Sequence, residues 1–382
     1  MKKVIPLIDV SALQKRPAQP ITVQSVDPDH MHRFLSHGMR FDKNIGLAGL
    51  YCNHPFNTVT IDNLGRCFVC ICQAWLPVSV GNILDFDSLD DIVHSPFARE
   101  IQRSIVDGSY QYCDHNTCSL ILGQQLQTRI DYKPDTVNWI NFAIDDSCNL
   151  QCPSCRTGLR FVKEGADFDL RTRISDHVAG LISRHEHFLR FTLSGDGDPF
   201  ASHVYRNLMR KIHGQPAEQL EIEIVTNGQL MKTHWDDLVN IYHNIVRVRV
   251  SFDAGSADTY HRVRRGGDWN RLVDSSRFLT NWLAQRQAVG QNKITTTESN
   301  FVVQASNYRE MPDFVNLCLD IGFDKITFQK VVNWNTWIDA QGQDQFDQHA
   351  VWMPNHADHA DFLSVLQHPI LQHPRVSLGN VV

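Results

Sequence analysis

The chain has 382 residues, of which 42% are hydrophobic and 20% charged, a balance typical of a soluble globular protein and not of a disordered one. Its formal net charge of -6 argues against a nucleic-acid backbone as the main partner, because surfaces that bind such backbones are usually basic. Pro6 and Asp9 interrupt the short apolar run at the N-terminus, and no apolar stretch approaches the roughly 20 residues of a membrane span. We therefore expect a cytoplasmic protein without membrane contact.

The first 134 residues stand apart by their cysteine content. Six of the ten cysteines lie between residues 52 and 118, together with a turn-rich stretch at 62–65 and a helix predicted over 88–105. Thiols stay reduced in the cytoplasm, where clustered cysteines usually bind metal. Proline and polar residues at 132–135 (Y-K-P-D) mark the best domain boundary. We expect a cysteine-rich α+β domain over 1–134.

From residue 137 onward, strand-like and helix-like segments alternate. Apolar residues recur at every second position in the predicted strands and at helical spacing between them. The strands are expected at 137–145, 187–195, 220–227, 245–253, 301–304 and 326–332, and the helices at 169–184, 203–213, 269–287 and 308–321. This alternation predicts a parallel sheet covered by helices, and six units fit a partial barrel over 135–335 better than a small doubly wound sheet. Periodicity alone does not separate the two. Residues 336–382 are expected to pack on the barrel as a C-terminal extension.

Polar and glycine-rich segments follow four consecutive predicted strands. In barrels of this kind, active residues gather at the C-terminal ends of the strands. We therefore predict one site at this rim, formed by the segments at 148–155, 194–199, 226–228 and 251–253.

The first of these segments holds three cysteines, Cys148, Cys152 and Cys155, in the spacing C-x3-C-x2-C. A closed tetrahedral zinc site or an ordinary iron–sulfur cluster needs four ligands. Either a thiol of the N-terminal group completes a zinc site, or one iron of a [4Fe–4S] cluster stays open to a small molecule. S-adenosylmethionine (SAM) could chelate that iron through its amino and carboxylate groups, and an electron from the cluster would then cleave its sulfonium.

The cysteine loop, with Asn149 and Leu150 directly after the first cysteine, resembles that of the radical SAM superfamily. The resemblance covers roughly residues 137–335. It implies an α/β fold made of a partial (β/α)6 radical SAM barrel and the smaller cysteine-rich α+β N-terminal domain. It also implies that Cys148, Cys152 and Cys155 bind the catalytic [4Fe–4S] cluster, with SAM as the second cofactor.

The loop after the second strand departs from the family pattern. Members usually carry Gly-Gly-Glu-Pro, which holds the methionine amino group, whereas this chain has the longer G-D-G-D-P at 195–199. The short carboxylate of Asp198, beside flexible backbone, can still accept a hydrogen bond from an ammonium group. Turn or cap roles are the alternative for residues at the later strand ends. The cofactor-binding residues that the resemblance implies are Gly195, Gly197, Asp198, Asn227, Ser251, Asp253 and Gln304.

The N-terminal cysteines resemble the SPASM and twitch extensions of radical SAM enzymes, in which C-x(9–15)-G-x4-C and later cysteines bind an auxiliary [4Fe–4S] cluster. Here the region precedes the barrel, although such extensions usually follow it, and it has six cysteines where a full SPASM domain uses seven. We predict one auxiliary cluster, and zinc would accept the same thiols. The expected ligands are Cys52, Cys70, Cys113 and Cys118, with Cys67 and Cys72 as alternative ligands or buried thiols.

Other features carry weaker signals. The arginines at 262, 264 and 265, followed by Gly266 and Gly267, form a basic turn that could hold a substrate carboxylate or phosphate or could be a solvated loop. Cys318 is expected in the core. The remaining candidates are read as a solvated helix start (His356, Asp358 and His359) and as packing residues (Trp334, Trp337 and Trp352).

The resemblance implies a radical SAM oxidoreductase or maturase. A 5'-deoxyadenosyl radical would abstract hydrogen from a peptide or a small metabolite, and the auxiliary cluster would assist oxidation or cross-linking. Dehydrogenation or epimerisation of a sugar or nucleoside is the alternative within the enzyme class. A flavodoxin or ferredoxin-type protein is the implied reductant. A non-catalytic zinc or iron–sulfur interaction protein is the alternative outside that class, and a scaffold would not need the polar strand ends.

Overall fold

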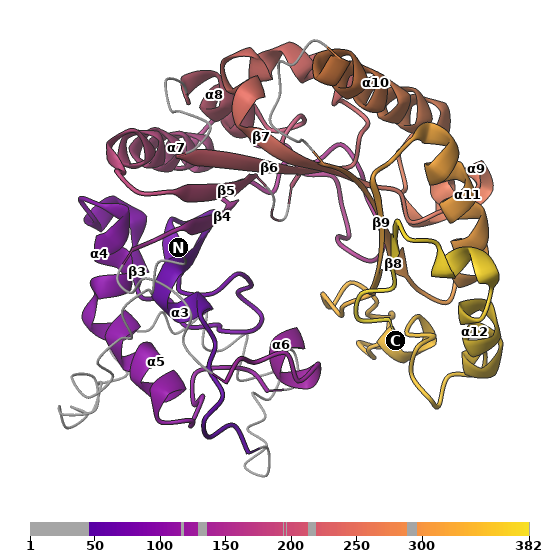
Figure 1. The fold of residues 1–382 in the computed structure, drawn as a ribbon, viewed down its shortest axis with the longest axis horizontal. Helices are drawn as coiled ribbons and strands as arrows, with labels where there is room; N and C mark the ends of the chain where they lie inside the picture. Colours follow the sequence, from indigo (N-terminus) through magenta and orange to yellow (C-terminus); the bar gives the residue numbers. More distant parts are fainter. Residues whose placement is uncertain are drawn as a thin grey trace, which may run out of the picture. The chain divides into compact units, whose positions relative to one another are not determined.

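The structure is a computed structural model that describes residues 46–115, 118–128, 136–193, 195, 197–212, 219–288 and 296–381. The chain forms two compact units, each discontinuous in sequence (Figure 1). The first contains the described residues up to Ile144, together with Ala166–Thr192 and Leu220. The second contains Asp145–Gly165 and the described residues of 193–217 and 221–382. The domain boundary expected at 132–135 lies outside the described residues, and the boundaries at 134/135 and 335/336 remain predictions.

In the first unit, the cysteine-rich region adds strands to the sheet. The strand β1 (Thr58–Asp62) pairs in parallel with β4 (Trp139–Ala143) and antiparallel with β2 (Arg66–Phe68), which pairs antiparallel with β3 (Gly81–Asn82). With β5 (Leu189–Leu193), the strand order in this unit is β3-β2-β1-β4-β5. All five residues of β1 are buried, so this strand lies in the core of the first unit.

The turn predicted at 62–65 joins β1 to β2. Gly65 adopts a φ of +80°, a conformation that favours glycine, and its N–H donates to the Asp62 carbonyl at 3.0 Å. The Asp62 carboxylate accepts from the Leu64 and Arg66 N–H groups at 3.0 and 2.9 Å. This local network fixes the hairpin that carries Cys67.

The single helix expected over 88–105 is wrong, because the structure has two. Ser88 begins α4 (Leu89–His94) with a capping box, and Ser95 begins α5 (Pro96–Val106) by accepting from the Ala98 N–H. Proline disfavours a helical conformation at the residue before it and fits the first position of a helix. Ser95-Pro96 therefore ends one helix and starts the next. The other helices of this unit are α3 (His54–Asn57), η2 (Ile83–Asp85), α6 (Ser119–Leu122) and α7 (Ala166–Arg184).

The second unit contains a parallel sheet in the order β6-β7-β8-β9-β10. Its strands are β6 (Leu220–Thr226), β7 (Ile245–Ser251), β8 (Thr296–Val303), β9 (Lys325–Lys330) and β10 (Val376–Ser377). Helices alternate with these strands, which confirms the expected mixed α/β fold with a mostly parallel sheet. They are α8 (His203–Lys211), η3 (Lys232–Asn244), α9 (Ala257–Val263), α10 (Trp269–Ala288), η4 (Tyr308–Glu310), α11 (Met311–Ile321), η5 (Phe346–Gln348), α12 (His359–Leu366) and η6 (Pro369–Gln372).

The two faces of this parallel sheet differ in chemistry. The helix α11 covers one face of the sheet (Figure 1). On that face, the Phe314 ring lies 5.0 Å from Phe301 and 5.6 Å from Phe328, measured between ring centroids. Side chains alternate along a strand, so Glu298 points to the opposite face, where Arg249 lies within 3.1 Å of its carboxylate. None of the described helices is long and apolar enough to cross a membrane.

Candidate functional site

The three-cysteine loop follows β4 in sequence and is held by its own backbone. The Cys148 N–H donates to the Arg160 carbonyl at 2.8 Å, and an ion pair of 2.9 Å joins Arg160 to Asp146. The Cys155 N–H donates to the Cys152 carbonyl at 2.9 Å, which closes a tight turn. Cys148 and Cys152 are buried and Cys155 is exposed. The loop therefore presents two inner thiols and one outer thiol.

Each of the three sulfur atoms has an N–H donor beside it. The donors are Asn227 Nδ2 for Cys148 (3.6 Å), Arg264 Nη1 for Cys152 (3.7 Å) and Arg156 Nη2 for Cys155 (3.7 Å). Iron–sulfur ligation requires thiolates, which such donors and charges stabilise. Burial raises the pKa of Cys148 to about 11 and also raises that of Cys152, while Arg156 and Arg264 respectively oppose these shifts. This donor set fits three thiolate ligands of a cluster.

The loop after β5 packs directly on the cysteine loop. The Asp198 N–H donates to the Ser147 carbonyl at 2.9 Å. A Cβ atom at Gly197 would lie 2.3 Å from the Asp145 carbonyl oxygen and 2.6 Å from that of Ser147, so only glycine fits there. Gly195 is exposed, with a φ of +110°. Gly197 therefore allows the close approach of two backbones.

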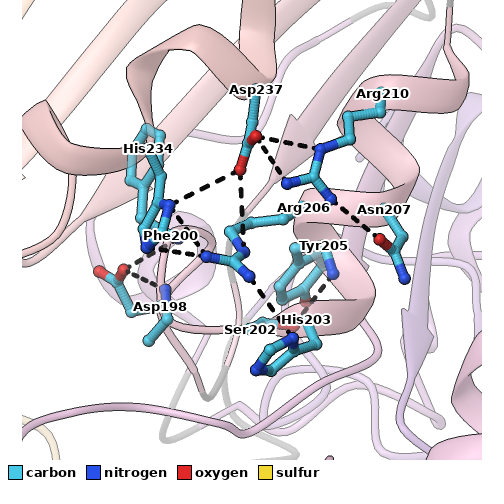
Figure 2. A network of polar contacts seen from close by, with 11 residues as sticks. Asp198, Phe200, Ser202, His203, Tyr205, Arg206, Asn207, Arg210, His234 and Asp237 are labelled. Atoms are coloured by element: carbon cyan, nitrogen blue, oxygen red, sulfur yellow. Dashed lines mark hydrogen bonds and ion pairs between the residues drawn. The ribbon is translucent and has the colours of Figure 1, made fainter.

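The Asp198 carboxylate is used within the protein. One oxygen accepts from the Phe200 and Ala201 N–H groups at 3.0 and 3.2 Å, and the other accepts from Thr226 Oγ1 at 2.8 Å and the Asn227 N–H at 2.7 Å (Figure 2 shows the Phe200 contact). A carboxylate has about four acceptor positions, and these bonds occupy them. Burial raises the pKa of Asp198, which those donors oppose. Asp198 thus positions Asn227, and its direct contact with a cofactor stays a prediction.

A second polar network fastens α8 to η3 beside this loop (Figure 2). Arg206 Nη1 lies 2.7 Å from His234 Nε2, and Arg210 Nη2 lies 2.7 Å from the Asp237 carboxylate. Ser202 caps α8 and donates to Asp145 at 2.5 Å. The arginine contacts therefore hold α8 against η3, and the contact between Ser202 and Asp145 holds α8 against the start of the cysteine loop.

The other predicted rim residues gather at the ends of β7 and β8. Asp253 is buried with a φ of +60°, and its carboxylate accepts from the Val302 N–H at 2.7 Å and pairs with Arg264 at 2.7 Å. Burial raises the pKa of Asp253, and the Arg264 charge opposes that shift. Ser251 ends β7 and is half-buried, and Gln304 is buried just beyond β8.

Sequence reasoning missed Arg156, and it named Arg264 only as part of a basic turn without its contact to the cysteine loop. Arg264 links Asp253 to Cys152, although the basic turn gave no sign that this arginine alone points inward. Arg156 directly follows Cys155, and its Nη1 also donates to the Asp146 carbonyl at 2.9 Å. The position of this positively charged residue, directly after the third cysteine, is the sequence signal that could have identified Arg156 as a partner of the thiols. Cys318 is fully buried in α11, as expected.

A cavity of about 420 Å³ lies beside the cysteine loop. Gln151, Pro153 and Arg156 of that loop line it, as does the predicted rim residue Gln304. Pockets of this size bind small molecules or parts of larger ones. It is therefore the candidate place for a substrate.

The first unit brings the four expected auxiliary ligands together. Burial is the main cause that raises the pKa of the Cys52 thiol, to about 12, and Cys118 raises it further through its charge. The charges of Cys52 and Cys113 likewise raise the pKa of Cys70, and the charge of Cys118 raises the pKa of Cys113. These four thiols are thus neighbours that raise one another's pKa, and their role as cluster ligands stays a prediction.

Cys67 and Cys72 differ in their surroundings. The Cys72 backbone N–H is close enough to the Cys70 thiol to oppose the rise in its pKa that burial causes, so Cys72 adjoins the group. Cys67 is fully buried, its sulfur lies 3.8 Å from the Gly65 carbonyl, and after burial the charges of Asp62 and Asp85 raise its pKa. Within the described residues, no three His, Cys, Asp or Glu side chains are grouped to hold a single metal ion.

Comparisons with known proteins agree with the motifs. Residues 52–119 match the SPASM family, described as an iron-sulfur cluster-binding domain. The chain is 25% identical over 190 residues to the GTP 3',8-cyclase of Alkaliphilus metalliredigens, covering 50% of this chain and 55% of that protein. It is 24% identical over 186 residues to the probable GTP 3',8-cyclase of Methanocaldococcus jannaschii, covering 48% and 55%. The chain thus spans about half the length of the curated relatives it matches.

Among solved structures, Streptococcus suis SuiB is 15% identical with a TM-score of 0.39, covering 62% of this chain and 48% of SuiB. The anSMEcpe structure with bound AdoMet and a peptide is 15% identical with a TM-score of 0.37, covering 51% of each chain. Radical SAM enzymes bind a [4Fe–4S] cluster and SAM, and SPASM domains bind auxiliary iron–sulfur clusters. Through its SPASM match, its similarity to the cyclases and its three-thiol loop, the chain is similar to radical SAM enzymes with a SPASM region.

Proposed function

We propose that the chain reductively cleaves SAM to methionine and a 5'-deoxyadenosyl radical, which abstracts hydrogen from a peptide or a small metabolite. The observation that carries this proposal is the loop of three thiols, each beside an N–H donor. A [4Fe–4S] cluster held there by Cys148, Cys152 and Cys155 would supply the electron for the cleavage.

The chain's own residues prepare this site. The N–H donors on Asn227, Arg264 and Arg156 stabilise thiolates, and Gly197 lets the next loop close over the cysteine loop. The residues proposed to contact SAM itself are Gly195, Gly197, Asp198, Asn227, Ser251, Asp253 and Gln304. Of these, Gly195 is exposed and Ser251 is half-buried, so both are open to a ligand.

The auxiliary site is proposed to hold one [4Fe–4S] cluster on Cys52, Cys70, Cys113 and Cys118. Their grouping supports this set, and Cys72 adjoins it as an alternative ligand. A cluster in this place would accept an electron from a substrate radical and so assist oxidation or cross-linking. Flavodoxin or ferredoxin is the proposed reductant.

The substrate is proposed as a peptide or a small metabolite. The named activity of the cyclase relatives favours a nucleoside or nucleotide as the second candidate. The proposed location is the cytoplasm, where clustered thiols stay reduced.

The proposal is tested by mixing anaerobically reconstituted protein with SAM and dithionite and measuring 5'-deoxyadenosine and methionine by mass spectrometry. We expect both products from wild type and from Cys318→Ala, a cysteine buried away from the loop, and neither from Cys152→Ser. Products at equal rates from all three proteins would contradict the assigned loop. Absence of products from wild type with bound iron would favour a non-catalytic iron–sulfur protein.

A further inference from the structure

The cavity beside the cysteine loop has an unusual charge. Its lining includes three guanidinium groups, from Arg156, Arg262 and Arg265, and none of its lining residues is acidic. The chain as a whole has a net charge of -6. A concave site lined by one sign of charge concentrates ligands of the opposite sign. The local charge of this cavity therefore opposes that of the whole chain and favours an anion.

The basic turn that supplies two of these arginines is held in one conformation. Arg264, between them, pairs with Asp253 inside the protein at 2.7 Å. A Cβ at Gly267 would lie 2.6 Å from the Tyr260 hydroxyl, so the turn closes tightly on that ring. The Gln151 N–H donates to the Arg265 carbonyl at 2.9 Å, which ties the turn to the cysteine loop. The Arg264 side chain is thus used inside the protein, whereas Arg262 and Arg265 belong to the cavity lining.

The two arginines on either side of Arg264 remain available to a ligand. Arg262 Nη2 donates to Thr259 Oγ1 at 2.7 Å, a neutral partner that orients the guanidinium without neutralising it. Thr259 in turn donates to the Glu310 carboxylate at 2.6 Å. For the Arg265 side chain, the described residues provide no hydrogen bond or ion pair. Both arginines thus keep charge and donors for an anion.

An aromatic pair and a buried hydroxyl group also belong to the cavity lining. The rings of Trp337 and His349 stack with centroids 4.4 Å apart and planes inclined by 17°, and both residues line the cavity. Thr336 Oγ1, also in the lining, is buried and has no hydrogen-bond partner among the described residues. A buried hydroxyl without a partner is costly, so a polar ligand in the cavity would relieve that cost.

We propose that this cavity binds a carboxylate or phosphate group of the substrate between Arg262 and Arg265. This inference rests on the proposed function and narrows its substrate class to anionic molecules. Guanidinium groups recognise both anions through paired N–H donors. With its anionic end held at the basic turn, the substrate extends along the cysteine loop past Gln151 and Pro153.

The test measures binding of two probes, inorganic pyrophosphate and succinate, to the anaerobically reconstituted full chain by calorimetry. We expect wild type to bind at least one probe and the Arg262→Gln/Arg265→Gln variant to bind it about tenfold more weakly or worse. Arg277→Gln is the matched control, because Arg277 is an exposed arginine of α10 paired with Asp320. Higher salt should weaken binding to wild type. Binding of pyrophosphate alone indicates a phosphate, and binding of succinate alone a carboxylate.

Two outcomes overturn the inference: wild type binds neither probe, or the double variant binds as tightly as Arg277→Gln. The same preparations are assayed for 5'-deoxyadenosine formation from SAM, which separates this failure from failure of the proposed function. If wild type forms 5'-deoxyadenosine while the arginines have no effect on probe binding, only the anion site is wrong. If no preparation cleaves SAM, the proposed function fails whatever the probes do.

Discussion

Asp253 and Arg264 form a buried ion pair in which Nη2 lies 2.7 Å from Oδ2. The same guanidinium donates to Cys152 Sγ at 3.7 Å. A single arginine thus connects the end of β7 to the cysteine loop, and the carboxylate also accepts from the Val302 N–H. Removing one partner of such a pair leaves the other charge buried and uncompensated.

We expect Asp253→Asn to lower the free energy of unfolding by about 3 kcal/mol, because the Arg264 charge loses its partner. Asparagine tolerates the positive φ of this position, so the backbone is preserved. Urea unfolding of the apoprotein measures the change. Asp274→Asn is the control, since its pair with Lys232 is exposed and should contribute about 0–1 kcal/mol. Equal losses in the two variants would show that the buried pair has no special weight.

Gly197→Ala should disturb the cysteine loop. The added methyl group would lie 2.3 Å from the Asp145 carbonyl oxygen, so one backbone must move, at a cost of about 1–3 kcal/mol. We expect lower stability and less iron bound after reconstitution. Gly158→Ala is the matched control. This glycine lies in the cysteine loop itself, and a Cβ there meets nothing within 4 Å. The packing argument is wrong if both variants behave like wild type.

The two neighbouring cysteines of the first unit should respond differently to substitution. Cys70 belongs to the thiol group with Cys52 and Cys113, whereas Cys67 is buried near Asp62 and Asp85. We expect Cys70→Ala to lose about four irons and Cys67→Ala to keep them. Iron analysis in the Cys148/Cys152/Cys155→Ala background isolates the auxiliary site. Loss of iron from Cys67→Ala alone would reverse the ligand assignment.

Glu298 should make stability depend on acid pH. Burial alone would raise its pKa, but Arg249, the Thr327 hydroxyl and Arg247 together hold the pKa below its usual value. A carboxyl group with a lowered pKa stabilises the fold above its unfolded value, and this contribution is lost as pH falls through the folded value. Relative to Glu298→Gln, the stability advantage of wild type should be constant above about pH 5 and shrink below about pH 4. An advantage that does not change with pH would refute this assignment.

Much of the fold could be predicted because the strands of the second unit alternate clearly. The expected strand at 245–253 matches β7, but β8 begins at Thr296, five residues before the expected start at 301. Before Phe301, β8 carries the buried polar residues Glu298 and Asn300. Polar residues interrupt the apolar pattern by which a buried strand is predicted. Glu298 can be buried because Arg247 and Arg249 of the neighbouring strand β7 pair with it, and the spacing within one segment does not show such partners.

The candidate site was predicted in its residue types but not in its contacts. The family resemblance identified Asp198 as a cofactor-binding candidate, whereas its carboxylate accepts from Thr226 and Asn227, which come much later in the chain. The resemblance selected Cys70 as a ligand and left Cys67 as an alternative ligand or a buried thiol. Their difference follows from the strand β2, which places Cys67 in the core, while Cys70 lies beyond its end. Such distinctions depend on tertiary contacts.

We propose that the chain binds two [4Fe–4S] clusters, one of them on the three-cysteine loop. Iron and acid-labile sulfide per chain after anaerobic reconstitution test it most directly, in wild type and in Cys148/Cys152/Cys155→Ala. We expect roughly eight irons in wild type and about four in the variant, with sulfide falling in proportion. Equal iron in the two proteins, or zinc in place of iron in both, would contradict the claim.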